Sequence, residues 1–129
     1  MQNHNNLKTH ALYSTLAKHL PELLSDDTIP LIFPSSENWC TIGNHYLMKG
    51  NYVNAEKYFA QASGMTPSLI YPKYNLWRTY LRQGKEDYAS RIADEILHMK
   101  VKVENTYTLR IRNTILNYKQ NKLEQLIYP

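Results

Sequence analysis

The residue types that could do nucleophilic, redox or metal chemistry are spaced in ways that assemble no site. The lone cysteine, Cys40, has no histidine within its own helical turn to activate it and no second cysteine for a disulfide or a zinc site. No two histidines are four residues apart, as a pair of metal ligands on one helix would be, and no histidine has the neighbouring carboxylates typical of a metal site. They are His4, His10, His19, His45 and His98. We expect no metal, no cofactor and no catalytic residue.

Two pairs of neighbouring carboxylates, at residues 86–87 and 94–95, could in principle do acid–base work. They lie beside Lys85 and Arg91 on a stretch with helical periodicity. The simplest interpretation is that these carboxylates balance the charge of the two cations and make the convex face of the helix polar. No glycine-rich loop that could cradle a phosphate is present in the sequence. The chain is therefore not expected to be an enzyme in its own right.

Basic and aromatic residues concentrate in the second half of the chain. Residues 68–122 carry eleven Lys or Arg against five acidic residues, and the whole chain has eleven tyrosines. Aromatic residues interleaved with cations can stack nucleic-acid bases. However, Tyr46 and Tyr80 fall where helix packing claims them, so we predict no nucleic-acid binding. The charge favours an anionic partner or surface, although a mildly basic solvated face is the commoner explanation.

The sequence contains no apolar run long enough to cross a bilayer; the cluster at residues 29–33, for example, is short and contains Pro30. The polar N-terminus shows no secretory signal. We expect a domain that is cytoplasmic or tethered to a membrane, with nothing in the sequence to indicate which side.

Hydrophobic periodicity and helix stop signals predict an all-helical chain. Residues 1–8 are expected to be a disordered tail, followed by a helix at residues 9–25 with a kink at Pro21. Further helices are predicted at 37–48, 53–63, from 68 or 71 to 82, 86–98 and 105–118, before a short apolar tail. Ser35 or Ser36 supplies a first N-cap, while Gly50 and Gly84 supply stops.

Two stretches of the chain align at a spacing of about 34 residues, and the positions that recur are those that a helix pair must bury. The aligned pairs are Ile42 with Leu76, Gly43 with Trp77, Tyr46 with Tyr80, Gly50 with Gly84, Ala55 with Ala89, Phe59 with Ala93, and Ala62 with Ile96. A period of this length marks a stacked helical array, in which each unit buries its apolar face against its neighbours. Such arrays are more often binding surfaces than catalysts.

The first stretch resembles the tetratricopeptide repeat at all of its usual positions. These are Trp39, Ile42, Gly43, Tyr46, Ala55, Phe59, Ala62 and Pro67. The second stretch departs from the signature at Lys73, Trp77 and Val101, so packing near Trp77 should be shifted. The resemblance implies one domain at residues 9–129, a right-handed superhelix with repeats at 36–69 and 70–103. Capping helices at 9–25 and 104–119 would cover its ends.

A narrower resemblance involves the runs at residues 50–56, 71–74 and 101–103. They are similar to the C-terminal repeat region of O-antigen ligase or polymerase family proteins of Bacteroides-like bacteria. In that family the repeats follow a multi-spanning membrane domain that handles lipid-linked glycans. The resemblance implies a soluble appendage of an enzyme of surface-polysaccharide biosynthesis, and none of the glycan chemistry maps to residues of this chain.

In tetratricopeptide arrays the first helix of each pair lines a concave groove, and this resemblance selects the candidate site residues. They are Asn44, Tyr71, Tyr74, Asn75, Arg78 and Arg82, with Arg110 and Arg112 available at the far end. Tyrosine, arginine and asparagine suit an extended peptide that carries carboxylates. Asn44 and Asn75 also occupy the asparagine positions of a known carboxylate clamp, but Cys40 stands where that clamp needs a lysine.

We therefore expect a protein-interaction or scaffold module that binds a protein or peptide segment of negative charge, as the soluble domain of a membrane-bound polysaccharide ligase or polymerase. The alternative is a structural module with no catalytic parent. That module would form a homodimer through the apolar tail of Leu123, Leu126, Ile127 and Tyr128.

Overall fold

The computed structural model describes residues 35–127, and this part of the chain is helical apart from short connections, as the all-α prediction requires. The helices are α3 (Ser36–Met48), α4 (Tyr52–Met65), α5 (Ile70–Arg82), α6 (Glu86–His98) and α7 (Thr106–Ile127). The tail predicted at residues 1–8, the capping helix predicted at residues 9–25 and Tyr128 lie outside the described residues.

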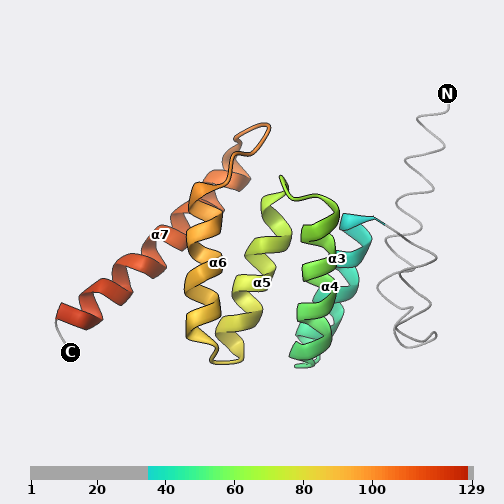
Figure 1. Ribbon diagram of the computed structural model, residues 1–129, viewed down its shortest axis with the longest axis horizontal. Coiled ribbons are helices and arrows are strands. Elements are labelled where there is room, and N and C mark those ends of the chain that lie inside the picture. Colours follow the sequence, from blue (N-terminus) through green and yellow to red (C-terminus); the bar gives the residue numbers. More distant parts are fainter. Residues whose placement is uncertain (1–34, 128–129) are drawn as a thin grey trace. The chain divides into compact units, whose positions relative to one another are not determined.

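Helices that follow one another in the chain pack antiparallel: α3 with α4, α5 with α6, and α6 with α7 (Figure 1). The chain divides after Thr66 into two compact units. The described part of the first unit holds α3 and α4, and that of the second holds α5, α6 and α7. The pairs α3–α4 and α5–α6 are spaced alike along the chain, because the offset from the start of α3 to the start of α5 equals the offset from the start of α4 to the start of α6.

Local capping explains where the helices of the first unit begin and end. The Ser35 hydroxyl accepts a hydrogen bond from the Asn38 amide at 3.1 Å, so Ser35, one of the two predicted N-caps, starts α3. Gly50, with a φ of 76°, ends α3 in the left-handed region. The Asn51 side chain then accepts a hydrogen bond from the Asn54 amide at 3.3 Å and starts α4. Gly84 repeats the stop in the second unit with a φ of 73°.

The first unit is held together by a close approach of α3 to α4. A Cβ built on Gly43 would lie 2.7 Å from Cε1 of Phe59, so only glycine lets the ring pack directly on the α3 backbone. Tyr58 stacks on Tyr46 with ring centroids 5.6 Å apart and also contacts Trp39. Gly43 and these aromatic residues are buried, which agrees with their assignment to the core.

The second unit builds an equivalent core with the large and small residues exchanged. Trp77 occupies the repeat position of Gly43, and Ala93 occupies that of Phe59. Both belong to one buried cluster in which α5, α6 and α7 take part. The rings of Trp77 and Tyr118 of α7 meet edge to face, with their centroids 5.3 Å apart.

The last helix is longer than the sequence predicts. The predicted start agrees with the structure to within two residues: Asn105 and Thr108 exchange side-chain-to-backbone hydrogen bonds of 2.9 Å that cap α7. The predicted end at residue 119 is wrong, because α7 continues to Ile127. No glycine or proline interrupts residues 119–127, which are rich in good helix formers. Ion pairs from Lys119 and Lys122 to α6 support the extra turns.

Arg112 fastens the start of α7 to the end of α6. Its guanidinium donates to the carbonyls of Ile96 and Met99, each at 2.6 Å, and to that of Leu97 at 3.3 Å. Its Nε atom also donates to Glu104 at 2.9 Å. The last carbonyls of a helix lack i+4 amide partners and carry the negative end of the helix dipole, so a guanidinium satisfies them well. The Ile96 carbonyl also accepts from the Met99 amide at 3.3 Å.

Candidate functional site

Four of the predicted site residues share one face of α5. Tyr71, Tyr74, Arg78 and Arg82 recur at spacings of three and four residues, which places them along one side of the helix. The Arg78 guanidinium carbon lies 5.8 Å from the centroid of the Tyr74 ring, within the range of a cation–π interaction. Tyr74 in turn stacks on the buried Trp77 at 5.7 Å. The core thereby holds the aromatic part of this face in place.

Asn75 lies beneath that face rather than on it. Its side chain is 0% exposed, and its Oδ1 atom accepts a hydrogen bond from Nη1 of Arg78 at 3.1 Å. Its Nδ2 atom has no hydrogen-bond partner among the described residues. A buried asparagine in this position orients the guanidinium of Arg78. In this arrangement it acts through Arg78 and presents no carboxamide to solvent.

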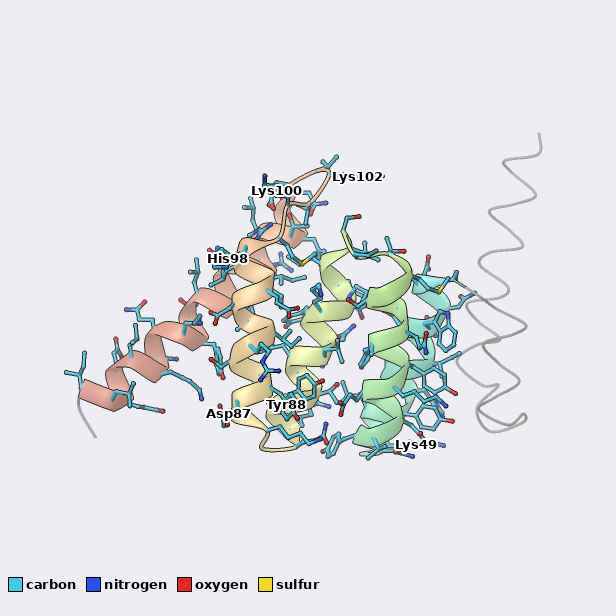
Figure 2. The ribbon with its side chains drawn as sticks, in the orientation of Figure 1. Lys49, Asp87, Tyr88, His98, Lys100 and Lys102 are labelled. Carbon is cyan, nitrogen blue, oxygen red and sulfur yellow. The ribbon has the colours of Figure 1, made fainter. Side chains whose placement is uncertain are left out.

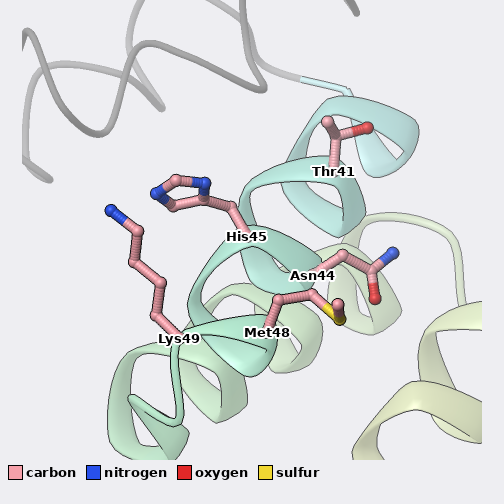
Figure 3. Close-up of a pocket in the computed structure, with 5 residues that line it drawn as sticks. All are labelled: Thr41, Asn44, His45, Met48 and Lys49. Carbon is pink, nitrogen blue, oxygen red and sulfur yellow. The ribbon is translucent and has the colours of Figure 1, made fainter.

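Asn44 belongs to the first unit, where it lines a depression of about 400 Å³ on α3. The other described residues of the lining are Thr41, His45, Met48 and Lys49. Figure 3 shows His45 and Lys49 projecting to one side, with Asn44 and Met48 turned to the other. One half of the lining is therefore basic, with His45 and Lys49, and the other half contains the carboxamide of Asn44 and the thioether of Met48.

A residue that the sequence analysis missed, Tyr107, extends the α5 face onto α7. Its ring lies 6.0 Å from that of Tyr71, joining the first turn of α5 to the first turn of α7. Arg110 follows one turn later on α7 and lines a depression of about 390 Å³. The other described residues of that lining are Thr106, Leu109, Asn113, Thr114 and Asn117. We call Tyr71, Tyr74, Arg78, Arg82, Tyr107 and Arg110 the tyrosine–arginine face.

The prediction that Arg112 extends the site is corrected by the structure. Its guanidinium is occupied by the carbonyls at the end of α6 and by Glu104, and its side chain is only 17% exposed. Sequence position alone could not separate Arg110 from Arg112, because both lie near the start of the same helix. The packing of α7 on α6 turns one inward and leaves the other exposed.

The charges of the second unit are distributed unevenly over its surface. The ion pairs are Lys73 with Glu95, Arg112 with Glu104, Lys119 with Asp94, and Lys122 with Glu86. Lys100 and Lys102 stand on the connection between α6 and α7, and Asp87 lies at the opposite end of α6 (Figure 2). Among residues 35–127, Arg78, Arg82 and Arg110, like Arg91, Lys100 and Lys102, form no ion pair with an acidic side chain. The tyrosine–arginine face therefore carries positive charge that the described chain leaves unbalanced.

One ion pair of the second unit shifts the pKa of both partners. Lys122 donates to Glu86, which lowers the pKa of the Glu86 carboxyl below its ordinary value and raises that of the Lys122 ammonium. Burial raises the pKa of the Tyr118 phenol, whose OH also donates to Glu86 at 3.2 Å. This cluster binds α7 to the start of α6.

Cys40 is buried, with 3% of its surface exposed. Burial, with a smaller contribution from the charge of Glu37, raises the pKa of its thiol to about 12. A thiol in this state is nearly all protonated at neutral pH and is a poor nucleophile. Within residues 35–127, no cluster of histidine, cysteine and carboxylate side chains is arranged to hold a metal ion.

None of the described helices is both long enough and apolar enough to cross a membrane. No model of a known protein family matches the chain, and no curated protein matches it.

Proposed function

We propose that this chain is a protein-interaction module of the tetratricopeptide type, which binds an extended acidic segment of a partner protein. On this proposal its helix pairs stack as a right-handed superhelix with capping helices at both ends. The repeat phase shared by α3 and α5, and by α4 and α6, supports the proposal. So do the two positive-φ glycines, Gly50 and Gly84, which stand at the same offset.

The observation that carries the proposal is the unbalanced charge of Arg78, Arg82 and Arg110. The acidic residues of the neighbouring α6 surface are largely engaged by lysines, whereas these guanidinium groups have no carboxylate partner in the described chain. Guanidinium groups bind carboxylates through paired, charge-assisted hydrogen bonds. The chemistry that fits this face is therefore a segment rich in glutamate or aspartate.

The tyrosines favour a segment with apolar or aromatic side chains between its acidic residues. Tyr71, Tyr74 and Tyr107 offer flat contact area at little cost in conformational entropy, because packing on Trp77 and between the two helices already restrains them. Asn75 restrains Arg78 in the same way. A pre-ordered surface loses less entropy on binding. The module acts by holding its partner and not by catalysis.

Binding can be tested with two fluorescein-labelled peptides, one alternating glutamate with tyrosine and the other with each glutamate replaced by glutamine. We expect the acidic peptide to bind the full chain in a fluorescence anisotropy titration and the glutamine peptide to bind much more weakly. The substitutions Arg78→Ala, Arg82→Ala and Arg110→Ala should each weaken binding by roughly fivefold, as expected for the loss of about 1 kcal/mol per partly exposed charge contact.

Arg91→Ala is the matched control, because Arg91 is an exposed arginine of the same unit that lies over Tyr88 on α6. It should leave the affinity unchanged. Equal binding of both peptides, or an equal loss of affinity in Arg91→Ala, would contradict the proposed site. Competition by nucleic acid at the same face would also contradict it, since the proposal assigns the face to protein.

The proposed setting is the soluble domain of a membrane-bound ligase or polymerase of surface polysaccharide, cytoplasmic or tethered to the membrane. It rests on the resemblance of residues 50–56, 71–74 and 101–103 to the repeat region of that family. Sequencing the natural gene upstream of residue 1 tests it. A series of apolar spans in the same reading frame is the expected result, and a stop codon directly upstream would remove the assignment.

A further inference from the structure

A stripe of leucines runs along the outer side of α7. Leu109, Leu116 and Leu123 recur once per heptad, and they are 51%, 51% and 61% exposed. Each is followed one helical turn later by another exposed side chain: Asn113, Gln120 and Ile127. Alternating spacings of four and three over this length form the heptad pattern of a two-stranded coiled coil. We call these residues the α7 seam.

The α7 seam is separate from the face that α7 packs on α6. The buried residues of α7 are Thr108, Ile111 and Ile115, all in its first half and none in the seam. The second half diverges from α6 (Figure 1) and is tied to it by the side chains of Tyr118, Lys119 and Lys122. A half-helix of this length is marginal without packing, and the outer face of a terminal array helix is normally polar.

We propose that the α7 seam pairs with the α7 seam of a second copy of this chain, as a parallel coiled coil in register. In that arrangement each seam residue meets its own counterpart, so leucine packs on leucine. The carboxamides of Asn113 and Gln120 then hydrogen-bond their counterparts. The antiparallel arrangement would set those carboxamides against leucines and leave them unpaired, which is costly in a desolvated seam.

Charge at the flanks of the seam is complementary in the same arrangement. In a parallel pair, a residue on one flank faces the residue five positions later on the partner helix. Lys119, whose ammonium pairs with Asp94 of its own chain, therefore lies beside Glu124 of the second copy, and no like charges meet at this flank. The antiparallel arrangement would bring Lys119 against Lys119. The flank charges thus favour the same register as the seam.

The length of the seam sets the strength of the dimer. A helix of 22 residues spans about 33 Å, and the seam from Leu109 to Ile127 is shorter than the about three to four heptads typical of coiled coils. A polar residue such as Asn113 fixes the register but lowers stability. We infer a concentration-dependent dimer rather than a permanent one. Pairing goes beyond peptide binding, since it would join two tyrosine–arginine faces in one assembly.

Sedimentation velocity over a range of concentrations tests the proposal on the full chain. The wild type should pass from monomer to dimer as its concentration rises, and Leu116→Asp should raise the dissociation constant by more than about tenfold, since a charge in the seam is desolvated without a partner. Val103→Asp is the control, because Val103 is 71% exposed on the connection before α7 and outside the seam. Asn113→Ile should tighten the dimer.

The orientation can be read from Asn113→Cys under mild oxidation, because the native Cys40 is buried. The parallel register predicts rapid disulfide formation between the introduced cysteines of the two copies. A cross-link that forms only when Asn113→Cys is mixed with Leu123→Cys would overturn the parallel register. A chain that stays monomeric at every concentration, or a dimer that Leu116→Asp leaves unchanged while circular dichroism shows normal helix content, would overturn the proposal.

Discussion

Replacing Gly43 with alanine should strain the contact between α3 and α4. The new Cβ would lie 2.7 Å from Cε1 and 2.8 Å from Cδ1 of Phe59, well inside van der Waals contact. The Phe59 ring is 0% exposed. Overpacking of this kind costs about 2 kcal/mol, and the better helix propensity of alanine returns about 1 kcal/mol. The net loss of unfolding free energy is therefore about 1 kcal/mol.

Gly64→Ala is the matched control within the same pair of helices. Gly64 lies in α4 with no heavy atom within 4 Å of the position that its Cβ would take. Only the propensity effect remains there, and near the helix end it should stabilise the chain by about 0.5 kcal/mol. The two variants should thus differ by about 1.5 kcal/mol. With a urea m-value of about 1.5 kcal/mol/M, their unfolding midpoints should be about 1 M apart.

The assay is urea unfolding followed by far-ultraviolet circular dichroism. The double variant Gly43→Ala with Phe59→Leu tests whether the Phe59 ring is the cause. Phe59→Leu should lower the unfolding free energy less in the Gly43→Ala background than in the wild type, and the difference, the coupling energy, should be about 1 kcal/mol. A Gly43→Ala midpoint equal to or above that of Gly64→Ala would refute the close approach of the two helices. Independent, additive effects of the Gly43 and Phe59 changes would refute it as well.

Three further measurements follow from individual side chains. Arg112→Ala should lower the unfolding free energy by about 2–3 kcal/mol, because charge-assisted hydrogen bonds to the last carbonyls of α6 are lost. The control Arg110→Ala, on the same helix, should change the unfolding free energy by less than about 0.5 kcal/mol. Equal urea midpoints of the two variants would contradict the capping role of Arg112. Iodoacetamide should alkylate Cys40 about a thousandfold more slowly in the folded chain than in urea, since its thiol is buried with a pKa of about 12; similar rates would show that the thiol is exposed. Folding lowers the pKa of Glu86, so its ion pair with Lys122 stabilises the fold above the ordinary carboxyl pKa, and this contribution is lost as the pH falls through the lowered pKa. Because the pair is largely exposed, Lys122→Met should reduce the unfolding free energy at neutral pH by no more than about 1 kcal/mol and should have no effect in strong acid. An equal effect of Lys122→Met at both pH values would contradict this pH dependence.

Helix limits that follow from short-range signals could be predicted from the sequence. The predicted helix at residues 86–98 matches α6, and the predicted start of α3 agrees to within one residue. Glycines with positive φ and side-chain caps act within one turn, so their effect is visible in the local sequence. The end of α7 has no such signal. It is stabilised by lysine contacts to α6, which depend on how the two helices pack.

The candidate site was predictable in part for the same reason. A shared helix face follows from spacing, so Tyr71, Tyr74, Arg78 and Arg82 could be grouped in advance. The burial of Asn75, the contribution of Tyr107 and the inward turn of Arg112 depend on contacts between helices. The core of the first unit combines Gly43 with Phe59 and that of the second contains Trp77 and Ala93, so the two cores are filled by different side-chain sizes.

Binding of an acidic segment by the tyrosine–arginine face is tested most directly by mapping amide chemical shifts of the isotope-labelled chain during titration with the glutamate–tyrosine peptide. We predict saturable changes at Tyr71, Tyr74, Arg78, Tyr107 and Arg110, with the outer face of α6 unaffected. Changes confined to α6, or no changes at any peptide concentration, would contradict the proposed site.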